Sequence, residues 1–422
     1  MIIAPALLSA LTIDEAIYQT INTNPQMSIK KAELNTENEL LTSAKSGYLP
    51  SIDLSYSIGP ETTQTIANFR KDVAVTRQEA SATLTQNLFT GFDTMNGVEQ
   101  QEARISSAGN SVADSANSIA LETATAYINL LRNKEFLNIS KENVEVHKKY
   151  LDQIQESVDA GVGRSSDAKQ TLSRYENAQS VYHLSKQNYD NSISSFQRLL
   201  PVDLQSNPIN KPTIGKLPVD NLEELTNMAL LFNPLVHVSE SDLRFAEAAL
   251  RRSNAPYYPK LDVVAQAYWN QGLNGIPDTA RYDEASGYNA LLVLSYNIFN
   301  GLNDSANKEA NRYRLVNQQS TLADSKRYIE AFTQIAWQTY NSTQTQLIHI
   351  DRNIMASAET VAAYQEEHSL GRRSIIDLLN IELEYNAAKN RKVTAEYDRI
   401  LAYYQILIHT GKMLETMNVT LK

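Results

Sequence analysis

The sequence predicts a mostly α-helical protein with a small β part, in which one helix–strand–strand–helix unit occurs twice. Three observations lead to this fold class. Short motifs recur at a spacing of 209 or 210 residues. Long polar stretches without proline alternate with short stretches in which apolar and polar residues alternate. Hydrophobic residues make up 42% of the 422 residues and the mean hydropathy is −0.38, which is typical of long helices that bury only one stripe.

The duplication is carried by four pairs of motifs. The pairs are Asn24-Pro25 with Asn233-Pro234, YLPSIDL from Tyr48 with YYPKLDV from Tyr257, LTQNLFTGF from Leu84 with LSYNIFNGL from Leu294, and GVGRSSD from Gly161 with LGRRSIID around Gly371. Four matches at one spacing indicate two structural repeats. We place the repeats at residues 11–200 and 222–413.

Three segments lie outside the repeats. Residues 201–221 are rich in proline, which predicts a linker or a strap across the surface. Residues 1–10 are apolar and resemble the latter part of a secretory signal peptide, although the basic region is missing. Residues 414–422 form a C-terminal tail.

Long helices are expected in both repeats. We predict them at residues 12–46, 94–158 and 165–199 in the first repeat, and at 222–254, 304–369 and 374–413 in the second. Proline, which breaks helices, is absent from residues 61–200 and 278–422. The longest helices would reach about 100 Å at 1.5 Å per residue, so the sequence predicts a coiled-coil bundle or α-barrel.

Four strands are expected at residues 51–58, 78–89, 261–269 and 288–299, joined within each repeat by loops of roughly 18 residues. In residues 51–58 apolar side chains alternate without a break with serine and aspartate. Each strand has about the length that a tilted strand needs to cross a bilayer. No helix has an apolar face broad enough to cover these strands, whereas lipid would cover them.

Four strands cannot close into a barrel on their own. An open edge in hydrocarbon leaves unsatisfied backbone groups, so chains must share strands, and three copies would supply twelve. Aromatic residues near the strand ends suit the level of the lipid headgroups: Tyr48, Tyr257, Tyr258, Trp269 and Tyr288. The alternative is a soluble helical domain with ordinary amphipathic hairpins packed on it.

Composition argues against several classes of protein. The net charge of −10 and the scattered basic residues do not suit nucleic acid. The chain has no cysteine, and its six histidines are too far apart for a metal motif, so we expect no metal and no cofactor. The GVG at Gly161 does not complete a nucleotide-binding loop. We find no catalytic constellation, and no apolar run of about 18 residues that would predict a transmembrane helix.

The order, spacing and duplication of these motifs, above all NLFTGF with NIFNGL and the GRRSIIDLL turn, resemble the TolC-type outer-membrane efflux and secretion proteins. The resemblance covers about residues 11–413. It implies a homotrimer with a twelve-stranded barrel in outer-membrane lipid and a helical tunnel across the periplasm. It further implies a passive duct that docks onto a periplasmic adaptor protein and an inner-membrane transporter. The competing hypothesis is a coiled-coil structural or adhesin-like protein without a channel.

The resemblance also implies functional residues at the periplasmic tip. Asp377 corresponds to the first carboxylate of the channel constriction, and Asn380 stands where a second aspartate is expected. Glu384, seven residues after Asp377 on the same helical face, would compensate in part. One acidic ring is therefore expected to be missing.

A second set of residues is expected to link the helices at the tip. Arg373 corresponds to the arginine of this gate, with Ser166 and Asp167 at its partner positions, while His368 replaces an expected tyrosine. The alternatives are that Asp167 and Asp377 simply favour the first turn of a helix, and that Arg373 is a solvated charge. Gly91 and Gly301, each after an aromatic residue, are expected to mark the change from strand to helix.

Overall fold

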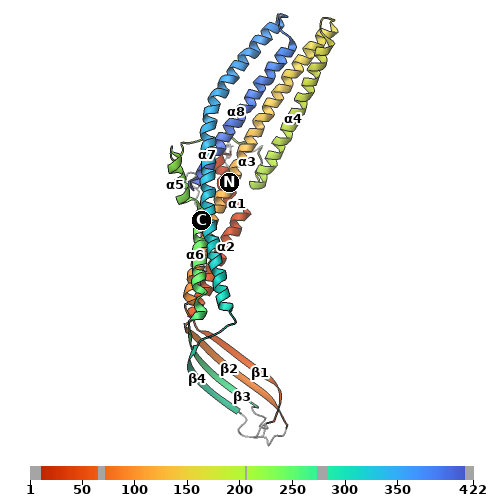
Figure 1. Ribbon diagram of the computed structural model, residues 1–422. Helices are drawn as coiled ribbons and strands as arrows, with labels where there is room; N and C mark the ends of the chain where they lie inside the picture. Colours follow the sequence, from red (N-terminus) through yellow and green to blue (C-terminus); the bar gives the residue numbers. More distant parts are fainter. Residues whose placement is uncertain (1–10, 65–71, 205–206, 273–283, 414–422) are drawn as a thin grey trace, which may run out of the picture. The chain divides into compact units, whose positions relative to one another are not determined.

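The computed structural model describes residues 11–64, 72–204, 207–272 and 284–413 (Figure 1). It confirms the predicted fold class, with long helices, four antiparallel strands and the same order of elements in both repeats. The first repeat contains α1 (Ile13–Thr23), α2 (Pro25–Lys45), β1 (Ser51–Thr63), β2 (Val73–Phe89), α3 (Asp93–Asp159) and α4 (Ser165–Leu199). The second contains α5 (Leu222–Phe232), α6 (Pro234–Arg252), β3 (Lys260–Gln271), β4 (Glu284–Ser295), α7 (Asn303–Ser369) and α8 (Ile375–His409).

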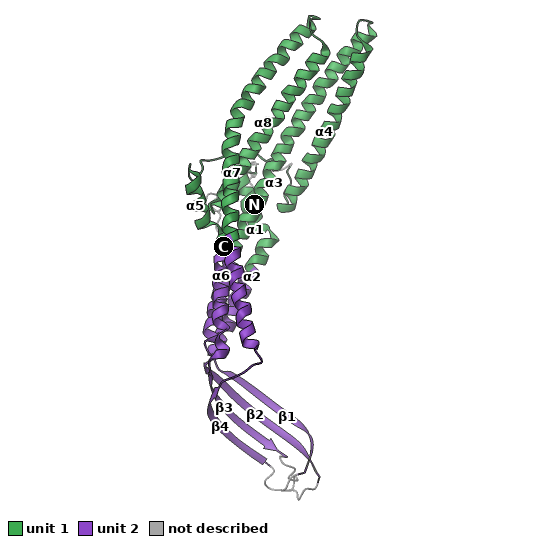
Figure 2. Cartoon of the chain, viewed as in Figure 1, with its two compact units in different colours: residues 1–31, 110–237, 324–422 green, residues 32–109, 238–323 purple. Residues whose placement is uncertain are grey.

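The chain divides into two compact units that cut across the repeats (Figure 2). The first unit comprises Met1–Lys31, Asn110–His237 and Asp324–Lys422, and the second comprises Ala32–Gly109 and Val238–Ala323. Each unit therefore combines equivalent parts of both repeats. The expected signal-peptide remnant at residues 1–10 and the tail at 414–422 lie outside the described residues.

The first helix of each repeat is broken, and here the prediction of single helices over residues 12–46 and 222–254 was wrong. Asn24 and Asn233 are extended, with ψ of 125° in both, because a residue before proline is disfavoured in the helical region. The following proline begins the next helix, where its missing N–H costs nothing. The repeated Asn-Pro pair is thus a helix break as well as a marker of the duplication.

The strands form one sheet in the order β1-β2-β3-β4. Its register places Leu54 opposite Ala82, Ala82 opposite Ala267, and Ala267 opposite Tyr288. One face of the sheet is therefore apolar from β1 to β4, as the alternation in the sequence predicts. The other face is polar on β1 and β2.

The strand ends differ from the prediction. Within each repeat the strands pair further toward the loop than expected, as far as Thr63 with Val73 and Gln271 with Glu284. β4 instead stops at Ser295, four residues before its expected end at 299. Ser295 pairs with Lys260, and the residue before Lys260 is Pro259, which has no N–H to continue the ladder.

In the first unit, α3 and α4 form one helical hairpin and α7 and α8 form another (Figure 1). Large side chains such as Tyr127, Phe196, Tyr397 and Ile406 are fully buried among these helices. None of the helices in the described part of the chain combines the length and the hydrophobicity that a membrane crossing requires.

The linker is fastened to the helices of the first unit as a strap. Leu11 forms a parallel bridge with Ile209, and the Leu11 N–H donates to the Pro208 carbonyl at 2.9 Å. The hydroxyl of the buried Tyr127 on α3 lies 2.7 Å from the Asn210 carbonyl oxygen and accepts a hydrogen bond from the Asn210 N–H at 3.0 Å. Lys211 adds an ion pair with Glu396 of α8 at 2.5 Å. The proline-rich segment is therefore held at its middle.

Replacing Tyr127 with phenylalanine is expected to loosen the strap. The change removes the hydroxyl that contacts the Asn210 backbone and the carbonyl of the buried Leu11, at 2.8 Å. It costs about 1–3 kcal/mol because the Leu11 carbonyl loses a partner. Trypsin should then cut the chain faster after Lys216, and the melting temperature should fall. Tyr18→Phe, at an exposed site on α1, is the matched control. Equal cleavage rates in both variants would show that Tyr127 does not hold the strap.

Candidate functional site

The apolar face of the sheet is exposed on its outer strands. Large side chains of β1 and β4 lie open on this face: Ile52, Leu54, Tyr56, Ile58, Tyr288, Leu292 and Leu294. Such a continuous exposed apolar patch is unusual for a protein surface in water and marks an interaction site. The opposite face carries hydroxyl contacts such as Ser55 with Ser81 at 2.8 Å, but near β4 it also carries Leu291 and Val293, which the alternation did not lead us to expect.

The two hairpin tips of the first unit have the same backbone. Gly161 ends α3 with φ of 77° and Gly371 ends α7 with φ of 71°, both in the left-handed region that favours glycine. At the second tip the Arg372 N–H donates to the Glu367 carbonyl at 2.9 Å, which closes the turn. The sequence motif around each glycine is thus a helix C-cap followed at once by a new helix.

Several residues that the resemblance assigns to a gate lie near Arg373 at the second tip. Its Nε donates to Glu367 Oε2 at 2.8 Å, its Nη1 lies 3.9 Å from Asp377 Oδ2, and the guanidinium lies 4.0 Å from the ring centre of Tyr364. His368 Nδ1 lies 2.8 Å from the Arg373 carbonyl oxygen. The hydrogen bond to Glu367 raises the pKa of Arg373 above its ordinary value. Arg373 thus remains one-third exposed while it contacts Glu367 of α7 and, at a longer distance, Asp377 of α8.

The partners expected on the other tip lie on α4. Ser166 donates to Asp167 at 3.1 Å, and Asp167 stands in the first turn of α4 as Asp377 does in α8. Among the described residues of this single chain, the ion pairs of Arg373 are with Glu367 and Asp377. A link from Arg373 to Ser166 or Asp167 stays a prediction.

The three residues expected at the constriction, Asp377, Asn380 and Glu384, share the more exposed side of α8. Asp377 is half-buried, while Asn380 and Glu384 are exposed. Asn380 accepts a long hydrogen bond of 3.4 Å from Arg174 of α4. An aspartate at position 380 would form an ion pair with Arg174. Compared with aspartate, Asn380 therefore gives a weaker contact between α4 and α8, and it also leaves α8 with one negative charge fewer.

Sequence reasoning missed a buried polar group directly behind this surface. Glu382 of α8 is 5% exposed and accepts a hydrogen bond from Tyr150 of α3 at 3.1 Å, while Gln365 of α7 donates to the Tyr150 hydroxyl at 3.0 Å. The signal was in the spacing, because Glu382 follows the buried Leu378 and Leu379 at helical intervals of four and three. A carboxylate on an apolar stripe needs such partners.

Burial shifts the pKa values of the ionisable side chains at this contact, Glu382 and Tyr150. Loss of water raises the pKa of Glu382 above its ordinary value, although the hydrogen bond from Tyr150 and the charge of Lys389 act in the opposite direction. The same burial raises the pKa of Tyr150 to about 12. His147, buried one turn earlier on α3, has its pKa lowered by burial and bonds to the Asn143 carbonyl. Three helices are thus joined near the tip by a polar contact whose contribution to stability depends on pH.

Further polar contacts continue the junction of α3 and α8 away from the tip. They are Asn143 with Asn386 at 2.8 Å, Glu142 with Lys389 at 2.9 Å, Glu135 with Tyr397 at 2.7 Å, and Arg132 with Asp398 at 2.6 Å. In the part of the chain that the structure describes, no group of three or more His, Asp or Glu side chains is arranged to hold a metal ion.

The two glycines that follow the strands occupy equivalent turns of the second unit. Gly91 lies between the end of β2 and the start of α3, and Gly301 lies just before α7. Both have positive φ, as do the next residues, Phe92 and Leu302, each at 67°. A bulky residue in this region is strained, so both repeats keep a costly turn at the same place.

Comparison with known proteins gives one consistent result. The sequence profile described as outer membrane efflux protein matches residues 16–200 and 225–411, once for each repeat. The chain is 22% identical to the outer membrane protein TolC of Escherichia coli, over 94% of this chain and 82% of TolC. It is 19% identical to AprF, the alkaline protease secretion protein of Pseudomonas aeruginosa, over 96% of this chain and 85% of AprF.

The fold is also similar to that of solved channels. The crystal structure of the Campylobacter jejuni CmeC outer membrane channel superposes with a TM-score of 0.84 at 14% sequence identity, covering 95% of this chain and 86% of the other. At this identity the similarity concerns the fold.

The stability of the wild-type protein relative to Glu382→Gln is expected to increase as the pH falls from 7 to about 4. The folded-state pKa of Glu382 is raised, so its contribution is fully present below the unfolded pKa and is lost as the pH rises through the folded pKa. Melting temperatures of both proteins across this range measure the trend. Glu384→Gln, two residues away and exposed, is the control. A difference between wild type and Glu382→Gln that does not change with pH would contradict the assignment.

Proposed function

The chain belongs to the outer membrane efflux protein family, and on that premise we propose that three copies form a passive, water-filled export duct. Its sheets would join into a twelve-stranded barrel in the outer membrane, and its helices would form a tunnel through the periplasm of a Gram-negative bacterium. A periplasmic adaptor protein and an inner-membrane transporter would supply the cargo and the energy. No covalent chemistry is required of the duct itself.

The sheet carries this proposal. One chain provides four strands, an apolar face exposed on its outer strands, and two sheet edges, β1 and β4, that lack a neighbour among the described residues. In hydrocarbon each unsatisfied backbone group costs several kcal/mol, so the edges need partners. Identical chains arranged in a ring supply them, since β4 of one copy can pair with β1 of the next.

The helical tips would form the periplasmic entrance. α3 and α7 each begin shortly after a strand and run for 67 residues to the hairpin turns at Gly161 and Gly371. Arg373, Glu367 and Asp377 would hold the tip of α7 and α8 closed, and Asp377 with Glu384 would give the narrow part a negative charge. Both roles are those that the resemblance implies, and the grouping of Arg373, Glu367 and Asp377 at this turn supports them.

Protein secretion and small-molecule efflux are both compatible with this duct. The relative AprF is described as a secretion protein, and the family as efflux proteins. Deleting candidate inner-membrane partners separates the two: loss of a secreted protein indicates type I secretion, whereas loss of drug tolerance indicates efflux.

The duct is tested by extracting the full chain from outer membranes in mild detergent, measuring its mass, and recording currents in planar bilayers. We expect trimers with stable ion conductance. The rival hypothesis, a coiled-coil structural or adhesin-like protein, predicts no conductance. A water-soluble monomer without affinity for detergent would rule out the duct.

Replacing Arg373 with serine is expected to raise the conductance several-fold. The change removes the contacts with Glu367, Asp377 and Tyr364 that join α7 to α8, so an open tip becomes more favourable. Single-channel currents in planar bilayers measure the effect. Arg372→Ser, at the neighbouring exposed position, should leave the current unchanged. Equal currents in the two variants would remove Arg373 from the gate.

The charge at positions 377 and 380 is expected to set the ion selectivity. Asp377→Asn should lower the preference for cations, because a ring of carboxylates attracts them, and adding Asn380→Asp to that variant should restore part of it. Reversal potentials under a potassium chloride gradient report the change. Unaltered reversal potentials in both variants would place the constriction elsewhere.

A further inference from the structure

On the polar face of the sheet, the largest side chain of β3 and β4 lies opposite a glycine. Tyr268 of β3 pairs with Gly287 of β4. Both belong to the polar face, because the alternation along each strand puts the next pair, Ala267 with Tyr288, on the apolar face. Gly287 is the one glycine within β3 and β4. The bulkiest and the smallest residue of this face are therefore direct neighbours.

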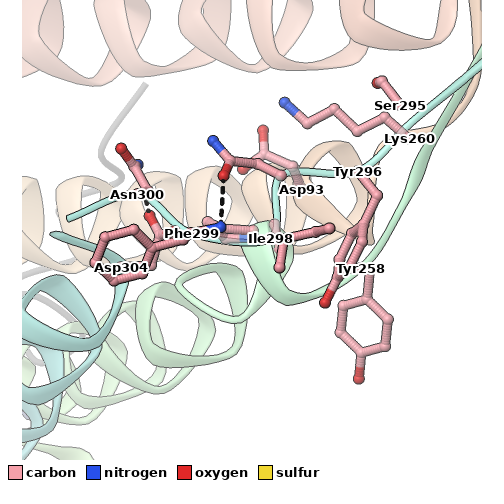
Figure 3. A pocket seen from close by; sticks show the side chains of 12 residues that line it. Asp93, Tyr258, Lys260, Ser295, Tyr296, Ile298, Phe299, Asn300 and Asp304 are labelled. Carbon is pink, nitrogen blue, oxygen red and sulfur yellow. Dashed lines mark hydrogen bonds between the residues drawn. The ribbon is translucent and has the colours of Figure 1, made fainter. Parts of the chain in front are cut away.

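This pair lies toward the loop end of the sheet. At the helix end Lys260 pairs with Ser295, and both residues line a cavity of about 850 Å³ (Figure 3). Tyr268 follows Lys260 by eight residues along β3, which is roughly 26 Å at 3.3 Å per residue. The pair is thus remote from the turns that lead into the helices, and it belongs to the strand part of the molecule alone.

The tyrosine ring lies directly on the glycine. A Cβ at Gly287 would lie 2.6 Å from the hydroxyl oxygen of Tyr268, 2.8 Å from its Cζ and 3.1 Å from its Cε1. Tyr268 is 38% exposed, whereas Tyr288, the next residue after the glycine on the apolar face, is 90% exposed. The ring of Tyr268 therefore runs along the sheet toward β4 and does not stand out from it.

The ring, and not the backbone, accounts for glycine at this position. Gly287 is not among the glycines with positive φ, so its backbone conformation is open to any residue. Glycine weakens a strand because it offers no side chain to pack. An aromatic ring that covers the glycine from the neighbouring strand restores part of this packing. A larger residue at 287 would leave the strand intact and displace the ring.

A displaced ring has little room elsewhere on the sheet. On the other side of Tyr268 its neighbour is Ser81 of β2, and the Ser81 hydroxyl is hydrogen-bonded to Ser55 of β1 at 2.8 Å. The remaining direction is the ordinary one for a strand side chain, perpendicular to the sheet. Without glycine at 287, Tyr268 would stand upright on the polar face.

We propose that Gly287 sets the width of the barrel lumen at this level by letting Tyr268 lie flat on the wall. The inference deepens the proposed duct and rests on it, since the polar face lines the bore when the apolar face meets lipid. A twelve-stranded barrel has a backbone diameter of roughly 24 Å, from strands about 4.8 Å apart and tilted by about 40°. Three upright tyrosines would obstruct this bore, whereas three flat rings leave it open to large solutes.

Polymer exclusion in planar bilayers tests this role. The full chain is added to one compartment, and its polar helices stay there, so the loop end of the strands faces the opposite compartment. Poly(ethylene glycol) added to that opposite side lowers the single-channel current if it fits into the lumen. We expect Gly287→Val to exclude polymers that enter the wild type, so the largest of them should lower its current at least about two-fold less. Gly287→Ala, whose Cβ meets the same ring, replaces it if the valine variant does not assemble.

Two control variants separate the ring from other effects of the substitution. Adding Tyr268→Ser to Gly287→Val removes the ring and should restore entry of the polymers. Gly59→Val is the matched glycine control, because Gly59 of β1 lies on the same polar face and a Cβ there would meet nothing within 4 Å. Its polymer cut-off should equal that of the wild type. Polymers added on the side of the helices should act alike on all variants.

Three results would count against these assignments. Trimers of native mass in which wild type and Gly287→Val share one polymer cut-off would overturn the role of Gly287 and leave the duct intact. Exclusion that persists after Tyr268→Ser would show that the valine itself narrows the bore, and would remove Tyr268 from the explanation. A wild-type protein without conductance would overturn the duct itself.

Discussion

The requirement that every backbone group of a strand find a hydrogen-bond partner shapes this protein more than any other constraint. A four-stranded sheet with an exposed apolar face satisfies its inner strands and leaves two edges open. In water such edges invite aggregation, and in lipid they are too costly to leave unpaired. The sheet of one chain is therefore incomplete at β1 and β4, and the proposed trimer would supply the missing partners.

The helical part meets a different requirement. Its long helices are too polar for one continuous apolar core, and they are joined by polar contacts spaced along α3 and α8. Each contact in the series is local, so one can be broken without dissolving the rest. Near the tip two polar contacts stand out. Tyr150 donates to the buried Glu382, and Arg373 contacts both Glu367 and the ring of Tyr364. A region held by a few specific contacts is suited to opening while the remainder stays packed.

Duplication links the two parts. Both repeats keep the Asn-Pro break, the strained turn after the second strand and the glycine at the tip, so one set of local geometries occurs twice in the chain. The repeats differ where their surroundings differ. Gly91 is crowded by Ala255, and Gly301 is not. Arg252 bonds to Asp93, whereas the equivalent positions hold Ser43 and Asn303, which cannot form an ion pair.

The sequence by itself determined the order of helices and strands, the duplication and the apolar strand face, because these depend on periodicity and on proline and glycine, which act within a few residues. It also located the tip through Asp377, Arg373 and Gly371. Only the tertiary structure decided that Arg373 turns back to Glu367, that Glu382 is buried against Tyr150, and that the linker is tied down by Tyr127. The Glu382 contact joins two helices and the Tyr127 contact joins a helix to the linker, so which side chains meet there depends on how these elements pack, which no local pattern specifies.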